Sequence, residues 1–500
     1  MIVRGRWVVT GWGPDDAVLA DGALQIREGR VAALGPYADV RARHPDSPVL
    51  GDGTHVVMPG FVNAHAHGRS SVGALLKGVP DEPLELRVVQ NYLGYSDGNP
   101  YWDVFLSAIE QLEGGITTTV HLDVYYSGPG ERYEARVRDA IRAYRDSGIR
   151  FAVALGIRDQ NNYAYERDED FLARVPAAIR TELGRWPKPG LGIDEYLAIY
   201  DRLREGFPER SLQFGPTNPV WCSEELLGRL REAATQRGAL IHIHLLETAY
   251  QKAYALERYG QSMVRWLTRS GFLDRTVTCG HSVWLTEDDI RVLAEVGASV
   301  AHNPSANLRM RSGVSPARAL TEAGVTVALG TDGMALNDDE DMLQEVRLAQ
   351  LLHSPPGIDT PSLAPEVVLR WATEHGARAA GLTGLGRLAP GGLADLVLLR
   401  PNWPDDGDVD RMGLAARVVQ RARRVAIDLV MVGGEVVVRG GQYVKSDRAE
   451  ALRQVAEAQG AGSHAAASPV WACKQHVASM YARDPWRVRG EPYYVVNARR

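Results

Sequence analysis

Eight short apolar segments rich in β-branched residues recur through the middle of the chain, and amphipathic helical patterns separate them. Strands that alternate with helices pair in parallel, and eight such units close into a barrel. The length of 500 residues suits one large barrel and a smaller companion domain. We therefore predict an α/β fold, a distorted (β/α)8 TIM barrel. Its expected strands are residues 61–67, 117–123, 150–157, 212–217, 239–247, 277–282, 299–304 and 326–332.

Strand patterns of another kind occupy both ends of the chain. Short alternating runs between Gly and Asp residues fill the start, and similar runs return at 392–401 and 429–444, where Gly-Gly marks a hairpin turn. We expect a small β-sandwich domain built from both chain ends. The predicted domains are the first part of the sandwich at 1–58, the metallohydrolase barrel at 59–385, the second part of the sandwich at 386–445, and a C-terminal helix with an aromatic tail at 446–500.

Two further stretches do not fit a minimal barrel. Residues 158–211 are long for one connection, which predicts an insertion over the active-site mouth. The last thirty residues contain Trp471, Trp486, Tyr493 and Tyr494. This aromatic content argues against a solvated tail. We therefore expect this segment to pack on the body or on a neighbouring subunit.

Composition excludes several classes of partner and site. The net charge of -6 offers no basic surface for nucleic acid or for an anionic membrane. The start of the chain lacks a signal peptide, and we find no run of about 18 apolar residues, so a cytoplasmic enzyme is the simplest interpretation. The three cysteines, Cys222, Cys279 and Cys473, are widely spaced and form no C-x-x-C pair, which argues against disulfides and a thiolate zinc site.

Polar side chains gather at the C-terminal ends of the expected strands, which all face the same mouth of a barrel. His65 and His67 end the first strand with i, i+2 spacing, His244 ends the fifth, and Asp332 ends the eighth. Three imidazoles and one carboxylate suit one divalent metal ion, Zn2+ first and Fe2+ second. Such a metal lowers the pKa of bound water to about 7, which makes hydroxide available as a nucleophile.

Catalytic roles follow from position. Glu247 lies three residues after His244 and is expected to deliver a proton to the leaving group. Asp332 accepts the proton of the attacking water, and His281, at the end of the sixth strand, either polarises the substrate or orients the nucleophile. One histidine at a strand end is more often an ordinary hydrogen-bonded side chain, so the ordered succession of these residues carries the argument. We expect His242 to point away from the metal.

The motifs PGFVNAHAH, IHIHLLET, CGHS, AHNPSANLRM, ALGTDG and GRLAPGGLADLVLL resemble the amidohydrolase superfamily, over roughly residues 1 to 445. Within it, the chain is similar to the branch of cytosine, guanine and S-adenosylhomocysteine deaminases and triazine hydrolases. The resemblance implies a single metal held by His65, His67, His244 and Asp332, because the fourth strand lacks the lysine that bridges two metals in binuclear relatives. It also implies a homodimer or a larger homo-oligomer.

Four residues are candidates for substrate binding. His302 and Asn303 match a segment that lines the pocket in such enzymes, although a capped turn is an equally good interpretation. Arg69 stands where many relatives have a small apolar residue, which suggests a different substrate face. Trp221 is placed to stack on a flat heterocycle, and core packing explains it as well. His121, on the second strand, either lines the pocket or packs.

These observations predict hydrolytic deamination of a purine-, pterin- or pyrimidine-like heterocycle, a small-molecule substrate. Two alternatives stay open. The same site would serve a cyclic amide or ureido hydrolase, or a triazine-type chlorohydrolase. A catalytically silent binding homologue is disfavoured, because every expected ligand and acid-base position is filled.

Overall fold

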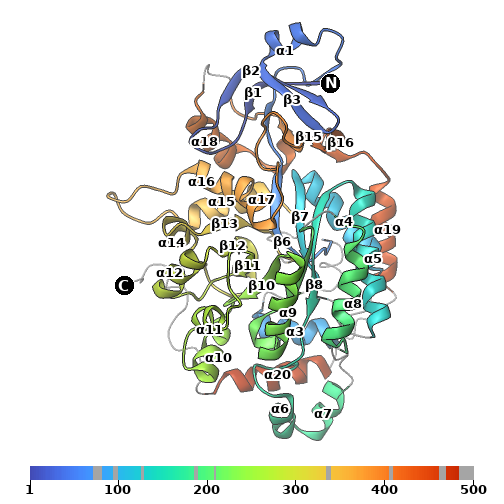
Figure 1. Cartoon of the computed structure of the whole chain (residues 1–500), viewed down its shortest axis with the longest axis vertical. Helices are drawn as coiled ribbons and strands as arrows, with labels where there is room; N and C mark the ends of the chain where they lie inside the picture. The colour runs from blue at the N-terminus through green and yellow to red at the C-terminus, as the bar shows by residue number, and fades with distance from the viewer. Residues whose placement is uncertain are drawn as a thin grey trace.

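The chain folds into a barrel with a smaller sheet unit at one end (Figure 1). The computed structural model describes residues 1–70, 82–93, 99–124, 129–184, 190–207, 210–333, 339–404, 409–460 and 469–483. The expected aromatic residues beyond 483 and the side chain of Trp471 lie outside this description. Among the helices that are described, none is both long and apolar enough to cross a membrane.

The barrel is one sheet of eight strands in chain order, and all neighbouring strands run parallel. Every strand falls within a segment expected from the sequence or within one residue of it, so the predicted TIM barrel is confirmed. The last strand returns to the first at the mouth, where Ala66 bridges to Asp332 and the Asp332 amide donates to the carbonyl of His65 at 2.8 Å. The strands are β6 (Phe61–Ala66), β7 (Ile116–Leu122), β8 (Arg150–Ile157), β9 (Leu212–Pro216), β10 (Ile241–Leu245), β11 (Val277–His281), β12 (Ser299–His302) and β13 (Thr326–Leu329).

The second sheet has nine strands and draws on both ends of the chain, as predicted. β5 joins the two parts, because it pairs with β1 from the start of the chain and with β14 from after the barrel. Gly433 and Gly434 turn the β15–β16 hairpin with positive φ angles of 54° and 80°, a conformation that glycine adopts without strain. The strands are β1 (Ile2–Val9), β2 (Val18–Arg27), β3 (Arg30–Pro36), β4 (Val49–Leu50), β5 (Val56–Pro59), β14 (Leu396–Leu399), β15 (Ile427–Val432), β16 (Glu435–Arg439) and β17 (Gln442–Tyr443).

Helices surround the barrel, and side-chain caps open some of them (Figure 1). Ser223 accepts a hydrogen bond from the Leu226 amide to open α9, and Thr286 with Asp289 forms a full capping box on α12. The α-helices described outside the mouth, these two included, are α1 (Tyr37–Arg43), α4 (Pro100–Glu113), α5 (Gly130–Ser147), α8 (Ile193–Arg204), α9 (Glu224–Arg237), α11 (Met263–Arg269), α12 (Glu287–Val296), α14 (Ala317–Glu322), α15 (Met342–Leu352), α16 (Pro365–Trp371), α17 (Glu374–Ala380), α18 (Arg411–Arg421) and α19 (Arg448–Gly460).

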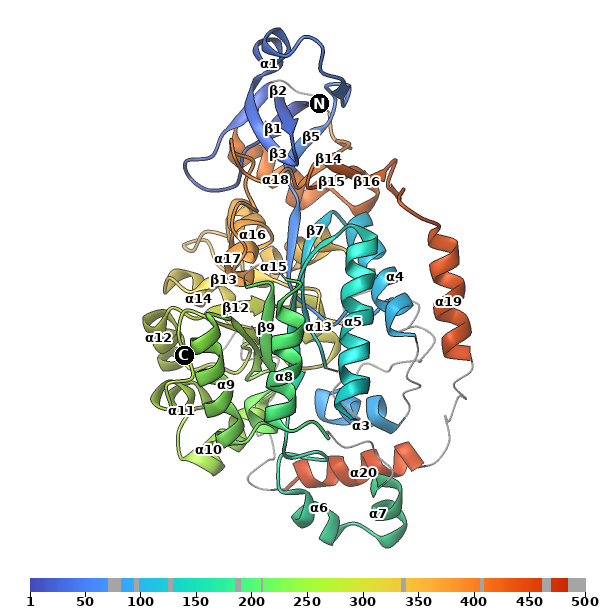
Figure 2. The same cartoon turned by 45° about the vertical axis from the view of Figure 1, so that its right-hand side comes forward.

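The C-terminal ends of the barrel strands face a group of helices remote from the second sheet (Figure 2). This group consists of α3 (Leu84–Leu93), α6 (Asp168–Arg174), α7 (Ala177–Gly184), α10 (Ala249–Tyr259), α13 (Pro304–Arg309) and α20 (Pro469–Tyr481). Helices α6 and α7 come from the long connection after β8. Lys474 of α20 forms an ion pair with Glu82, just before α3, and Val477 and Met480 are buried in the main core. The C-terminal helix therefore belongs to the wall around the mouth.

Candidate active site

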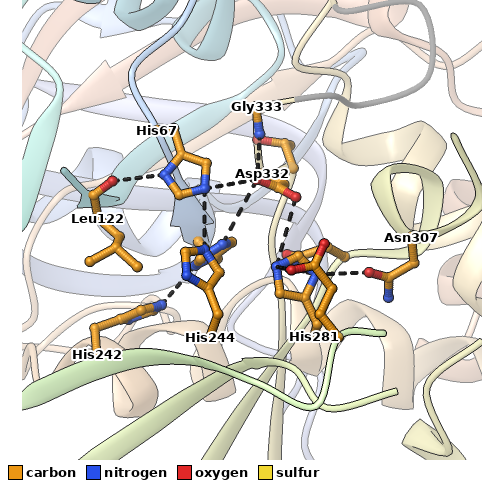
Figure 3. A network of polar contacts seen from close by, with 12 residues as sticks. His67, Leu122, His242, His244, His281, Asn307, Asp332 and Gly333 are labelled. Atoms are coloured by element: carbon orange, nitrogen blue, oxygen red, sulfur yellow. Dashed lines mark hydrogen bonds and ion pairs between the residues drawn. The ribbon is translucent and has the colours of Figure 1, made fainter. Parts of the chain in front are cut away.

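Five polar residues from four barrel strands meet at the mouth, and all are buried (Figure 3). His65 and His67 come from the end of β6, His244 from β10, His281 from β11, and Asp332 follows β13. The nitrogens of His65, His67 and His244 lie within 4.8 Å of one another, and ligand atoms of His65, His281 and Asp332 do so as well. The structure thus brings together all four side chains that the sequence nominated as metal ligands.

Hydrogen bonds at the rear of the rings orient two of these imidazoles. Nδ1 of His67 donates to the carbonyl of Leu122 at 2.7 Å, and Nδ1 of His244 donates to the carbonyl of Thr217 at 2.6 Å. With the proton on Nδ1, each Nε2 presents a lone pair to the centre, and the two Nε2 atoms are 3.4 Å apart. Two ligands about 2.0 to 2.1 Å from a tetrahedral zinc would lie about 3.3 Å apart, so this pair fits one metal.

The third imidazole is held by another histidine. His65 Nδ1 lies 2.7 Å from Nε2 of His242, while His65 Nε2 is buried and has no hydrogen-bond partner among the residues that the structure describes. The expectation that His242 points away from the site is therefore wrong. Side chains two residues apart on a strand share a face, so His242 points into the barrel as His244 does.

The charge balance of the cluster calls for a shared cation. Nε2 of His67 and Oδ1 of Asp332 are 3.0 Å apart, and two such acceptors repel unless a proton or a metal lies between them. Burial, reinforced by neighbouring histidines, lowers the pKa of His65 and of His244 well below the usual value, which favours the neutral, ligating form. Burial alone would raise the pKa of Asp332, whereas positive charge at its contact with His67, carried by a proton or by a metal ion, would lower it. The donor set and the orphaned His65 nitrogen fit a divalent metal.

Two acid-base candidates stand beside this centre. Oε2 of Glu247 is 3.7 Å from Nε2 of His281, which in turn is 3.9 Å from Oδ2 of Asp332. Burial, with the negative charges of Asp332 and Glu85, raises the pKa of Glu247 well above its usual value. The protonated form of Glu247 is thereby favoured, and a proton donor beside a carboxylate such as Asp332 is an arrangement typical of paired acid and base groups.

Asn307, on α13, is a residue that sequence reasoning missed. Its Oδ1 accepts from Nδ1 of His281 at 2.8 Å, which leaves Nε2 of His281 as an acceptor facing Glu247 and Asp332. The only signal was its place within the AHNPSANLRM motif.

The backbone around these groups is strained. Leu246, His281, Ser282 and Asp332 have φ angles of 46°, 66°, 50° and 61°, in the left-handed region that residues other than glycine rarely adopt. Strain of this kind is often found where side chains are held for function. It aims Asp332 and His281 into the centre.

The four substrate-binding candidates are placed differently. Asn303 reaches the site, because its Nδ2 is 3.3 Å from Nδ1 of His281, and Arg69 lies beside Gly333. His302 is buried against His353, with their Nε2 atoms 2.9 Å apart. Trp221 is 7% exposed and lies under Arg158, whose guanidinium carbon is 5.3 Å from the ring centre. Substrate contact by these residues stays a prediction.

His121, left open between pocket and packing, is buried, and its Nδ1 contacts the hydroxyl of Tyr144 at 2.9 Å.

Comparisons with known proteins identify the family and similar folds. The model of the amidohydrolase family matches residues 56–437, and that of an imidazolonepropionase-like composite domain of bacteria matches residues 22–46. A 5-methylthioadenosine/S-adenosylhomocysteine deaminase of Pelotomaculum thermopropionicum is 32% identical, over 92% of this chain and 97% of the relative. A 5'-deoxyadenosine deaminase of Methanosarcina mazei is 29% identical over the same shares. The crystal structure of an adenosine deaminase from Xanthomonas campestris with bound zinc superposes with a TM-score of 0.75 and 26% identity, over 92% of this chain and 98% of that one.

Proposed function

The chain belongs to the amidohydrolase family, and from this premise we propose that it is a metal-dependent deaminase of 6-aminopurine nucleosides. The reaction would replace the exocyclic amino group by a carbonyl oxygen and release ammonia. The observation that carries the proposal is the convergence of three imidazoles and Asp332 on one point, with Glu247 beside it. The deaminase names of the relatives support the choice of substrate.

We propose that His65, His67, His244 and Asp332 hold one zinc ion. When bound, the metal supplies Lewis acidity that activates water as the nucleophile. The hydrogen bonds from His67 to Leu122 and from His244 to Thr217 keep the ring nitrogens in place for this task.

The protein's own groups would move the protons. Asp332, ionised, accepts the water's proton on a carboxylate oxygen, and Glu247, protonated, delivers its proton to the departing amino nitrogen. His281 has its Nδ1 proton engaged by Asn307, so its Nε2 accepts a hydrogen bond and orients the attacking water. This favours the orienting role over polarisation of the substrate.

Ammonia release from a substrate panel tests the proposal. Zinc-loaded protein would be incubated with 5'-deoxyadenosine, adenosine, guanine, cytosine, an aminotriazine, a cyclic amide and a chlorotriazine, with mass spectrometry of the products. We expect ammonia and the corresponding oxo product from an adenine nucleoside. Ring-opened products from cyclic amides, or chloride release from chlorotriazines, without deamination would overturn it in favour of the other C–N or C–Cl hydrolases.

Two further expectations remain predictions. We propose that the chain assembles as a homodimer or a larger homo-oligomer, which light scattering on the purified protein would measure. We also propose a cytoplasmic location, which cell fractionation would test.

A further inference from the structure

A pocket of about 470 Å³ lies beside the candidate active site, between α3, α10 and α20. Leu86 and Pro83 form one side of it, and Ala478 of the C-terminal helix lies opposite. Its volume falls in the range of about 300 to 1,000 Å³ that small-molecule sites occupy. In the following we call it the α3–α20 pocket.

A buried carboxylate lines the α3–α20 pocket. Glu85 is 5% exposed, and its Oε1 accepts hydrogen bonds from the hydroxyls of Thr248 at 2.6 Å and Tyr165 at 2.9 Å. The other oxygen, Oε2, is buried and has no hydrogen-bond partner within the described part of the chain. Buried polar atoms in folded proteins nearly always have partners, so this oxygen is open to a donor from a bound ligand.

Two tyrosine rings line the same pocket. Tyr250 and Tyr481 have ring centres 4.7 Å apart with planes tilted by 51°, and the Tyr481 hydroxyl accepts from the Tyr165 amide at 3.1 Å. Aromatic faces attract cations through their quadrupole. Burial raises the pKa of Glu85, and an ammonium group beside it would favour the ionised form, whose charge attracts the cation in turn. A carboxylate with two aromatic rings is a combination suited to an organic cation.

We propose that the α3–α20 pocket binds an organic ammonium group, whose N–H donates to Oε2 of Glu85 while its carbon frame packs on Tyr250 and Tyr481. An inorganic cation is a poor match, because it would prefer several oxygen ligands and gain little from the rings.

The residues that line the α3–α20 pocket are connected to Glu247, the candidate proton donor. Thr248, bonded to Glu85, directly follows Glu247 in the chain. Gln251 accepts from the Glu247 amide at 2.8 Å through Oε1, and its Nε2 lies 3.3 Å from the Tyr165 hydroxyl. The ammonium group therefore belongs either to an arm of the substrate or to a separate small amine bound next to it.

Binding of benzylamine, which is cationic at neutral pH, tests the proposal by calorimetry on the full-length protein. We expect Glu85→Gln to weaken binding about 10- to 100-fold, since it removes one charge-assisted hydrogen bond. Ala478→Trp, which fills the pocket from an exposed position on α20, should abolish binding without disturbing the buried network. Glu366→Gln is the matched control, since it removes another buried, unpartnered carboxylate oxygen, on α16, and should leave binding unchanged. Benzyl alcohol, the neutral analogue, should bind far more weakly than benzylamine.

Failure of benzylamine to bind, equal binding of benzyl alcohol, or full binding by Glu85→Gln would overturn the proposal. Turnover rates of two substrates decide where the ammonium group comes from. This part of the experiment rests on the proposed function. If the group is a substrate arm, 5'-amino-5'-deoxyadenosine is preferred over 5'-deoxyadenosine, and Glu85→Gln removes the preference. If it is a separate amine, the preference is absent while benzylamine still binds. Absence of any deamination would count against the proposed function and leave the benzylamine result to decide on the pocket.

Discussion

Replacement of Glu247 by Gln isolates proton delivery from every other property of the site. Glutamine has the same shape as the carboxyl group but carries no transferable proton. Glu247 is 2% exposed, its Oε1 has no hydrogen-bond partner among the described residues, and its Oε2 is 3.7 Å from His281. No ion pair therefore needs to be broken to make the change.

The size of the effect follows from the environment. Because burial and the charge of Asp332 raise the pKa of Glu247 well above its usual value, the neutral carboxyl group is favoured over the carboxylate. Exchange of one neutral group for another should change the free energy of unfolding by no more than about 1 kcal/mol. Turnover should fall by about 10²- to 10⁴-fold, or about 3 to 5 kcal/mol in the barrier, because the leaving amine loses its proton donor.

The assay is the rate of ammonia release, with metal content and thermal melting measured on the same preparations. Glu366→Gln, far from the centre on α16, serves as a control and should leave all three quantities unchanged. Full activity of Glu247→Gln at unchanged metal content would refute the assignment of the proton donor.

Three more outcomes follow from the structure. His242→Phe removes the partner of His65 and should weaken metal binding about 10- to 100-fold in chelator competition, whereas His375→Phe, on α17, should not. Asp332→Asn should lower both metal retention and turnover, the latter by at least about 100-fold, and unchanged retention would argue against its role as a ligand. Burial raises the pKa of Glu345 from 4.5 to about 7, so the contribution of this group to stability is greatest below about pH 4.5 and is lost towards pH 7, where the unfolded chain releases the proton and the folded chain holds it. Glu345→Gln should flatten that fall, by at most about 3 kcal/mol, in thermal melts recorded across this range.

The barrel could be predicted because its strands have a clear sequence pattern. Parallel strands buried on both faces appear as continuous apolar runs, such as residues 150–157, and the caps at Ser223 and Thr286 mark where helices begin. The helices at the mouth were harder to predict from the sequence. The packing of α20 beside α3 involves the ion pair of Lys474 with Glu82, a contact between residues far apart in the chain that no local pattern reveals.

The candidate site could be predicted where metal-ligating residue types occur at a spacing that puts them on one side of the chain. His65 and His67 share a strand face, and the fold brings Asp332 to them by closing the barrel. The same rule puts His242 on the strand face of His244, and the structure places it against His65, contrary to the expectation that it points away from the metal. Asn307 was missed because an amide that holds a catalytic ring has no sequence signature of its own. The metal-ligand roles themselves await measurement.

Metal analysis of the purified, zinc-loaded chain tests the central claim most directly. We predict about one zinc per chain in the wild type and about none when His65 and His244 are both replaced by Ala, in a protein that remains folded by circular dichroism. A folded double variant that still binds one zinc per chain would contradict the account.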